Sequence, residues 1–193
     1  MAEFFDALND DHRAFVAAQP LFFVATAAAD GRINLSPKGY DVFRVLGPDR
    51  VAYLDLRGSG NETHAHLVAE QADAGRITIM FNNFGNPANI LRIYGKGVPV
   101  LPQDSGWDEL AGHFEILPGT RQIFDIRVES VQTSCGYGVP HMTLERERET
   151  LVKYHAQTDE DEWFQKVRAN DSSIDGLPVR QTEKFLNQTG DAK

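Results

Sequence analysis

The chain has 193 residues, a mass of 21.5 kDa and a formal net charge of −9, which suits one domain or one domain with a small appendage. Hydrophobic residues make up 41% and charged residues 24%, a balance that is typical of a folded globular protein and argues against disorder. The acidic charge argues against a general nucleic-acid binder, because binding driven by phosphates needs a basic surface. The single cysteine, Cys135, excludes an internal disulfide framework and a thiolate zinc cluster.

Hydropathy argues against a membrane partner. The longest apolar run covers residues 21–25 and is far too short to cross a bilayer. The first residues also lack the charged, apolar and small-residue pattern of a secretory signal. We therefore expect a cytoplasmic protein that binds neither membranes nor nucleic acids.

The first third of the chain reads as a helix followed by short strands. Pro20 ends the helical pattern, and Asp30-Gly31 is typical of a tight hairpin turn. The expected elements, in order, are a helix over residues 6–18 or a shorter one starting at residues 9–11, and strands over residues 21–27, 33–36 and 51–56.

Helix formers then return, with Gly75 as the expected helix stop. The expected elements are a helix over residues 62–74, strands over 77–81, 90–95 and 98–101, a short helix over 107–114 and an alternating strand over 122–132. Several short strands with one clear intervening helix favour a small β-barrel or an antiparallel α+β domain.

The composition changes after Pro140. Charged helical patterns cover residues 144–156 and 160–169, and residues 187–193 are typical of a frayed tail. This region has too few apolar residues for a core of its own. We therefore expect a barrel domain over residues 1–140 and a helical extension over residues 141–193 that packs on the barrel or on a second subunit.

A glycine-containing loop over residues 56–64 joins a strand end to a helix start. Such a junction exposes backbone N–H groups and the positive end of a helix dipole, which suits a phosphate. Arg57 supplies charge, Ser59 and Thr63 supply hydroxyl groups, and Asn61 is a good helix cap. The alternative is an ordinary loop and helix cap without a ligand.

A second candidate segment is Ser36-Pro37-Lys38-Gly39, which ends a strand and leaves Lys38 at a sheet edge. With Arg57, Lys38 would place two cations around one anionic group. The alternative is a surface turn.

Several segments together resemble the flavoproteins related to pyridoxamine 5′-phosphate oxidase. They cover the first hairpin through Ser36-Pro37-Lys38-Gly39, the strand and loop from Tyr53 to Thr63, and the strands over residues 77–81 and 91–97. Their order matches that family across residues 15–131, and residues 134–140 resemble one uncharacterised branch of it. The order of the segments carries the resemblance more than any single motif.

The resemblance implies a mainly β protein with flanking helices, folded as a split β-barrel. It also implies a homodimer that binds FMN in clefts between the subunits and uses a small-molecule substrate or electron donor. Within that site it would place Ser36 and Lys38 along the flavin ring or ribityl chain, Arg57, Asn61 and Thr63 at the 5′-phosphate, and Asn82, Arg92, Cys135 and Tyr137 at the ring or substrate.

The chain departs from the vitamin B6 oxidase itself. It lacks the C-terminal Trp and Arg-x-His pattern, and Glu62 and Thr63 stand where that enzyme has a basic pair. Flavin binding is therefore better supported than oxidation of pyridoxamine phosphate, and the resemblance implies an FMN-dependent oxidoreductase whose substrate the sequence does not reveal. A non-catalytic flavin- or haem-binding carrier or sensor on the same fold is the alternative.

A metal site is a third hypothesis. His64-Ala65-His66 with Glu70 resembles half of the cupin metal motif, in which two histidines lie on one strand face. On a helix, however, residues two apart point in different directions, and residues 67–72 favour a helix. We therefore assign no metal ligand.

Overall fold

The computed structural model describes residues 2–69, 74–159, 161–162, 165 and 172–180. In this part of the chain, eight strands form one antiparallel sheet. The strands are β1 (Glu3–Phe5), β2 (Phe22–Thr26), β3 (Asn34–Lys38), β4 (Phe43–Val45), β5 (Arg50–Leu56), β6 (Gly75–Asn82), β7 (Asn89–Val100) and β8 (Thr120–Cys135). The helices are α1 (Asp10–Ala17), α2 (Glu62–Ala69), α3 (Trp107–Ala111) and α4 (Thr150–Gln157).

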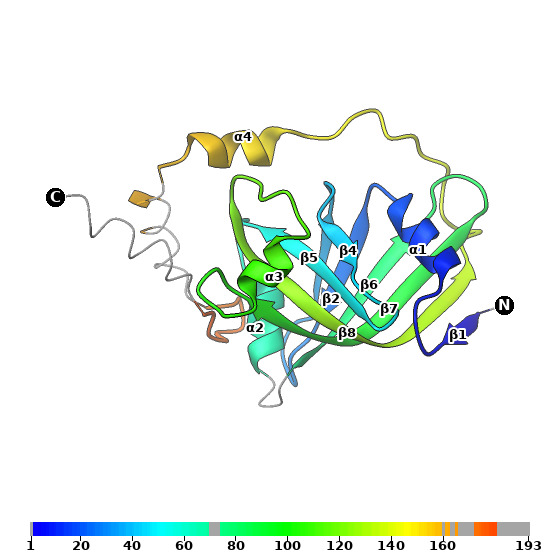
Figure 1. Cartoon of the computed structure of the whole chain (residues 1–193), viewed down its shortest axis with the longest axis horizontal. Coiled ribbons are helices and arrows are strands. Elements are labelled where there is room, and N and C mark those ends of the chain that lie inside the picture. The colour runs from blue at the N-terminus through cyan, green and yellow to red at the C-terminus, as the bar shows by residue number, and fades with distance from the viewer. Residues whose placement is uncertain (1, 70–73, 160, 163–164, 166–171, 181–193) are drawn as a thin grey trace.

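The sheet curls into a split β-barrel, as predicted. Its strand order is β3-β2-β6-β7-β8-β5-β4, with β1 paired to β8, so that β3 and β4 stand at the two ends of this order. Figure 1 shows α1 and β1 towards one end of the molecule and α2 and α3 towards the other. The described residues contain no helix long and apolar enough to cross a membrane.

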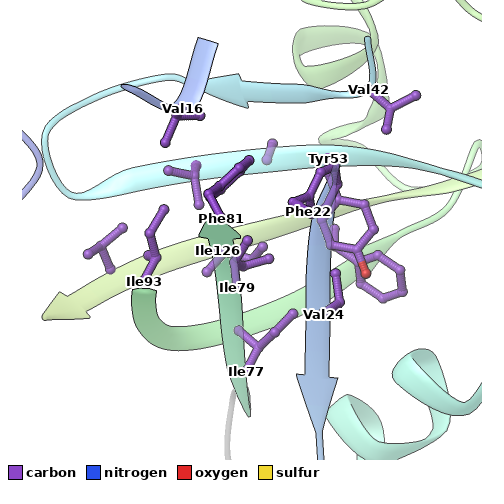
Figure 2. Packing of buried hydrophobic residues seen from close by; sticks show 14 of the residues in the cluster. Val16, Phe22, Val24, Val42, Tyr53, Ile77, Ile79, Phe81, Ile93 and Ile126 are labelled. Carbon is purple, nitrogen blue, oxygen red and sulfur yellow. The ribbon is translucent and has the colours of Figure 1, made fainter. Parts of the chain in front are cut away.

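Strands β2 and β6 form the centre of the core. Alternate side chains of β2 are fully buried, because a strand turns successive residues to opposite faces. Phe22 and Val24 thereby meet Ile79 and Phe81 of β6 inside the barrel (Figure 2). Aromatic rings fill the centre of this core, with centroids 4.9 to 5.6 Å apart in the pairs formed by Phe22, Phe43, Tyr53, Phe81 and Phe124. Edge-to-face contacts of this kind add to the burial energy of the rings.

Helix α1 follows the shorter of the two predicted alternatives. Asn9 caps its first turn, since Asn9 Oδ1 accepts the His12 N–H at 2.9 Å and His12 Nδ1 accepts the Asn9 N–H at 3.3 Å. The helix begins after this reciprocal pair because the cap satisfies N–H groups that would otherwise lack partners.

Gly75 does not end a helix, so that prediction is wrong. It is the first residue of β6, and helix α2 packs directly over it. A Cβ at Gly75 would stand 2.7 Å from the Leu67 carbonyl oxygen, which is closer than real Cβ atoms come. The glycine therefore permits a close approach of helix and sheet. The end of the predicted 62–74 helix includes residues 70–73, which lie outside the described residues.

The other expected strands are present with shifted limits. The turn expected at Asp30-Gly31 is wider than a tight hairpin, since the last paired residues of β2 and β3 are Thr26 and Asn34. The segments predicted at residues 90–95 and 98–101 form the single strand β7, whose register shifts between Tyr94 and Gly95. Strands β1 and β4 were not predicted, because three residues are too few to show alternation.

Beyond β8 the chain passes over the barrel to α4 (Figure 1). The helix predicted over residues 144–156 begins only at Thr150, and the segment before it has no regular structure. The Tyr40 hydroxyl donates to the Arg148 carbonyl at 2.5 Å, and His155 Nε2 hydrogen-bonds to the Arg57 carbonyl at 2.8 Å. Most of the predicted helix over residues 160–169 and the whole tail over 187–193 lie outside the described residues.

Candidate functional site

Edge strand β3 presents polar side chains to the inside of the split barrel. Asn34, Ser36 and Lys38 pair in register with Thr26, Val24 and Phe22 of β2. Directly paired residues point to the same face of a sheet, so these three side chains share the face that bears the core. Opposite them lie the end of β5 and the start of α2. We call this group the seam site, defined by Asn34, Ser36, Lys38, Asp55, Asn61, Thr63, Arg121 and Gln122.

Asp55 is the centre of the charges in the seam site. Its side chain is 1% exposed, and it contacts Lys38 Nζ at 2.9 Å and Arg121 Nε at 2.6 Å. Burial alone would raise the pKa of Asp55, but Arg121, Lys38 and a hydrogen bond from Gln122 hold that pKa well below its usual range. The carboxylate is therefore ionised, and it holds two cations, Lys38 and Arg121, beside each other.

Gln122 joins the charged cluster to helix α2. Its Nε2 donates to Asp55 Oδ2 and to Asn61 Oδ1, both at 2.8 Å. Its Oε1 lies 2.6 Å from His64 Nδ1. Burial lowers the pKa of His64 to about 4, so the imidazole is neutral at pH 7. Lys38 and Asn61 are thus connected through Asp55 and Gln122.

A second set of hydrogen bonds connects β3 to α2. Asn34 Nδ2 donates to Thr63 Oγ1 at 3.0 Å and to Thr26 Oγ1 at 3.2 Å, and the Ser36 hydroxyl donates to Asn34 Oδ1 at 3.0 Å. Thr26 Oγ1 also lies 3.1 Å from His66 Nδ1. The side chains of Ser36 and Thr63 therefore both hydrogen-bond to the side-chain amide of Asn34.

Arg57 and the glycine loop follow β5 directly. The Arg57 N–H donates to the Gly119 carbonyl at 2.8 Å, and the residue is 5% exposed. Residues 58–60 are exposed, and a Cβ at Gly58 would meet no atom of the described residues within 4 Å. A ligand could therefore reach the backbone of this loop. Arg121 Nη1 donates to the Gly60 carbonyl at 2.8 Å, which places the loop beside the cationic cluster.

Of the four remaining predicted residues, three lie on other strands and Tyr137 lies in the turn after β8. Asn82 is buried at the end of β6, and Arg92 of β7 donates through Nη1 to Ser134 Oγ at 3.2 Å. Cys135 ends β8 opposite Asn89, and Tyr137 is 87% exposed. Within the described part of the chain, no side-chain hydrogen bond or ion pair joins these four residues to the seam site.

The sequence does not predict four residues of the seam site: Asp55, Arg121, Gln122 and Asn34. A signal was available for the first, because Asp55 is the only charged residue among the apolar positions 51–56. A buried charge requires partners. Gln122 is the first residue of the strand predicted over residues 122–132, and Arg121 directly precedes it. Their partnership depends on the register that pairs Asp55 with Gln122, which the sequence does not display.

The two histidines of the metal hypothesis contact different partners. Both lie on α2, with His64 against Gln122 and His66 against Thr26. Glu70, the third member of that motif, lies outside the described residues. The described residues contain no group of three or more His, Cys, Asp or Glu side chains that could hold a metal ion.

The seam site fits a phosphate-bearing ligand such as FMN. Lys38 and Arg121 keep 22% and 14% of their side-chain surface exposed, so an anion could reach them. The exposed glycine loop beside them offers backbone donors, and the β3 row of Asn34 and Ser36 offers hydrogen-bonding groups along one side.

Comparison with known proteins gives the family. A family model described as pyridoxamine 5′-phosphate oxidase matches residues 8–135. The chain is 35% identical to the pyridoxamine 5′-phosphate oxidase family protein ustO of Aspergillus flavus, over 92% of this chain and 78% of that protein.

Two solved structures share the fold. One is a Lactobacillus delbrueckii protein with a provisional assignment as a pyridoxamine 5′-phosphate oxidase, which is 16% identical with a TM-score of 0.52 and covers 66% of this chain and 94% of its own. The other is a variant of HupZ from Group A Streptococcus, which is 19% identical with a TM-score of 0.51 and covers 65% of this chain and 98% of its own. Together, the match to the family model and the relative in Aspergillus flavus show that this chain belongs to the pyridoxamine 5′-phosphate oxidase family.

Proposed function

We propose that the protein is an FMN-binding flavoprotein and an oxidoreductase that acts on a small molecule. The observation that carries this proposal is a pair of cations at the seam site, where Lys38 and Arg121 both contact the carboxylate of Asp55 beside an exposed glycine loop. Family membership supports the same proposal. A bound flavin would supply the redox chemistry, and the protein would supply binding, orientation and electrostatics.

The residues divide into two roles under this proposal. Lys38 and Arg121, with the backbone of residues 58–60, would hold the 5′-phosphate. Asn34, Ser36 and Thr63 would orient the ribityl chain and the adjacent ring edge through their hydrogen-bonding groups. Arg57 would contribute positive potential near the phosphate.

The proposal includes a second copy of this chain. Strand β3 stands at one end of the strand order, and its outward residue Leu35 is 66% exposed next to the site-facing Asn34 and Ser36. An edge strand with exposed apolar side chains is usually covered by another element. A partner subunit on this strand would also close the site from outside.

The experiment compares FMN with riboflavin, which lacks the phosphate. Wild-type protein is expected to take up FMN, to absorb between about 350 and 500 nm as bound flavins do, and to bind riboflavin more weakly. Lys38→Met should weaken FMN binding about tenfold or more, as loss of one charge-assisted hydrogen bond predicts. It should leave riboflavin binding nearly unchanged, which also verifies that the variant is folded.

Lys153→Met is the matched control, because Lys153 is an exposed lysine of α4 that pairs with Glu149, the residue before that helix. Equal loss of FMN affinity in both variants would contradict the phosphate assignment. Anaerobic reduction by NADH or NADPH then separates an enzyme from a carrier, since slow reduction that does not saturate would favour a non-catalytic carrier.

A further inference from the structure

Residues 172–180 form a compact turn that we call the C-terminal clasp. Ser172 and Pro178 form an isolated β-bridge, and within the turn the Ser173 N–H donates to the Leu177 carbonyl at 2.8 Å. Gly176 has a φ of 79°, a left-handed conformation that favours glycine. The clasp therefore has a defined shape of its own.

Three parts of the barrel anchor the clasp. Asp175 forms an ion pair with Arg32 in the loop between β2 and β3, and also accepts the Arg32 N–H at 2.7 Å. The Ile174 N–H donates to Glu62 Oε1 at 3.0 Å at the start of α2. Arg180 Nη2 contacts Asp104 Oδ1 at 2.7 Å near α3. The clasp thus spans the end of the barrel at which α2 begins.

A fourth contact reaches a buried side chain. The backbone N–H of Arg180 donates to His64 Nε2 at 3.0 Å. A backbone N–H can only donate, so His64 Nε2 must be an acceptor, and the proton of the neutral ring must lie on Nδ1. That Nδ1–H then donates to Gln122 Oε1 at 2.6 Å.

This tautomer also fixes the direction of the hydrogen bonds that Gln122 makes with Asp55 and Asn61. Because Oε1 of Gln122 faces His64, its Nε2 faces Asp55 and Asn61 and donates to both. The result is a one-way chain of donors from the clasp through His64 and Gln122 to the carboxylate that holds Lys38 and Arg121.

Reversal of the chain would damage the seam site. If the proton of His64 moved to Nε2, Nδ1 would become an acceptor and Gln122 would have to turn its amide. Oε1 of Gln122 would then face the carboxylate of Asp55, acceptor against acceptor, inside a buried cluster. The backbone N–H of Arg180 opposes that reversal, because it needs an acceptor at His64 Nε2.

We propose that the C-terminal clasp sets the tautomer of His64, and that His64 and Gln122 act as positioning residues for the cationic cluster at the seam site. The inference rests on the proposed function only in the identity of the ligand, an organic phosphate. The chain of donors belongs to the protein without a ligand.

Two variants of the same residue test the proposal. Arg180→Ala and Arg180→Pro both lose the ion pair with Asp104, but only the proline variant also loses the backbone N–H. Comparison of the two therefore isolates the hydrogen bond to His64. The readout is the ¹⁵N spectrum of the histidine rings in full-length protein without ligand, in which His64 is assigned by its absence from His64→Asn.

We expect His64 in wild type and in Arg180→Ala to be the neutral Nδ1–H tautomer. In Arg180→Pro we expect a mixture that includes Nε2–H. A wild-type ring protonated on Nε2, or identical His64 signals in the two Arg180 variants, would overturn the proposal.

Titration with FMN gives the second readout. We expect Arg180→Pro to bind FMN about tenfold more weakly than Arg180→Ala. Misplaced cations at the seam site would lose the equivalent of one hydrogen bond to the charged phosphate of FMN. Equal FMN affinities would overturn the positioning role. If wild type binds no FMN at all while the ring spectra differ as expected, the proposed function fails and the control of the tautomer by the clasp stands. The two failures are therefore distinguishable.

Discussion

Asp55 shows how a single residue organises the candidate site. A carboxylate that is 1% exposed is stable only when its negative charge is compensated, and here Lys38, Arg121 and Gln122 compensate it together. The contacts of Asp55 with Lys38 and Arg121 also fix the positions of these two cations. Their orientation therefore exists before any ligand arrives, which is the condition for binding an anion with little reorganisation.

Asp55→Asn should strongly destabilise the fold. The substitution removes the charge that compensates Lys38 and Arg121, and we expect it to lower the free energy of unfolding by about 3 kcal/mol at pH 7. Urea denaturation measures the change. The control is Glu109→Gln, which removes one partner of the exposed ion pair with Arg50 and should change stability by less than about 1 kcal/mol. Similar losses in the two variants would show that the charge of Asp55 is not required for stability.

His64 predicts a pH dependence of stability. Its pKa is lowered to about 4 by burial, with Gln122, Arg121, Arg180 and Asp55 around it, while the unfolded chain keeps a value near 6.5. Between these two values the unfolded state binds more protons than the folded state, so acidification favours unfolding. The contribution of His64 to the free energy of unfolding is complete above pH 6.5 and is lost as the pH falls towards 4.

His64→Asn isolates this effect because asparagine does not titrate. We expect wild-type protein to lose up to about 3 kcal/mol more than the variant between pH 6.5 and pH 4, measured by urea denaturation at a series of pH values. Parallel curves for the two proteins over that range would mean that His64 titrates normally in the folded state.

At the scale of elements, the contact between α2 and β6 depends on one glycine. Gly75→Ala would drive a Cβ into the backbone of Leu67, and backbone atoms cannot rotate away as a side chain can. We expect a loss of about 3 kcal/mol in the free energy of unfolding. Gly138→Ala is the control, because a Cβ there would meet no described atom within 4 Å. Denaturation curves that match for both variants would disprove the tight packing.

The sequence predicts an element correctly where the residues of that element alone determine its structure. The strand over residues 21–27 and the shorter helix that starts at residues 9–11 depend on local residues, and the sequence predicts both. The sequence predicts two strands in place of β7, because Gly95, Gly97 and Pro99 are typical of strand breaks when the neighbouring strands are unknown. Those residues are tolerated because β8 pairs along the whole of β7.

The site was predictable only in part, for a related reason. Strand and loop motifs pointed to Lys38 and Asn61, which the structure connects through Asp55 and Gln122. Their connecting residues come from strands that are far apart in sequence, and nothing local marks Gln122 as a partner of Asp55. The contact between Arg180 and His64 joins residues 116 positions apart, so it too depends on the complete fold.

At the scale of the whole molecule, the outer face of β3 argues for a dimer. Period-two alternation sends Asn34, Ser36 and Lys38 into the seam site and leaves Leu35 and Pro37 outside. A second copy over this strand would cover Leu35 and bring new side chains to the site. Light scattering should therefore give wild-type protein twice the 21.5 kDa of one chain at micromolar concentration.

Leu35→Glu tests this arrangement, because a buried unpaired carboxylate at the interface would oppose association. We expect the variant to be monomeric, folded and weakened in FMN binding, since the site would lose its outer cover. Ile116→Glu is the control, an equally drastic change at an apolar residue that is half exposed in the loop between α3 and β8. If the wild type is monomeric, or if both variants dissociate alike, then β3 is not the dimer surface and each seam site must be complete within one chain.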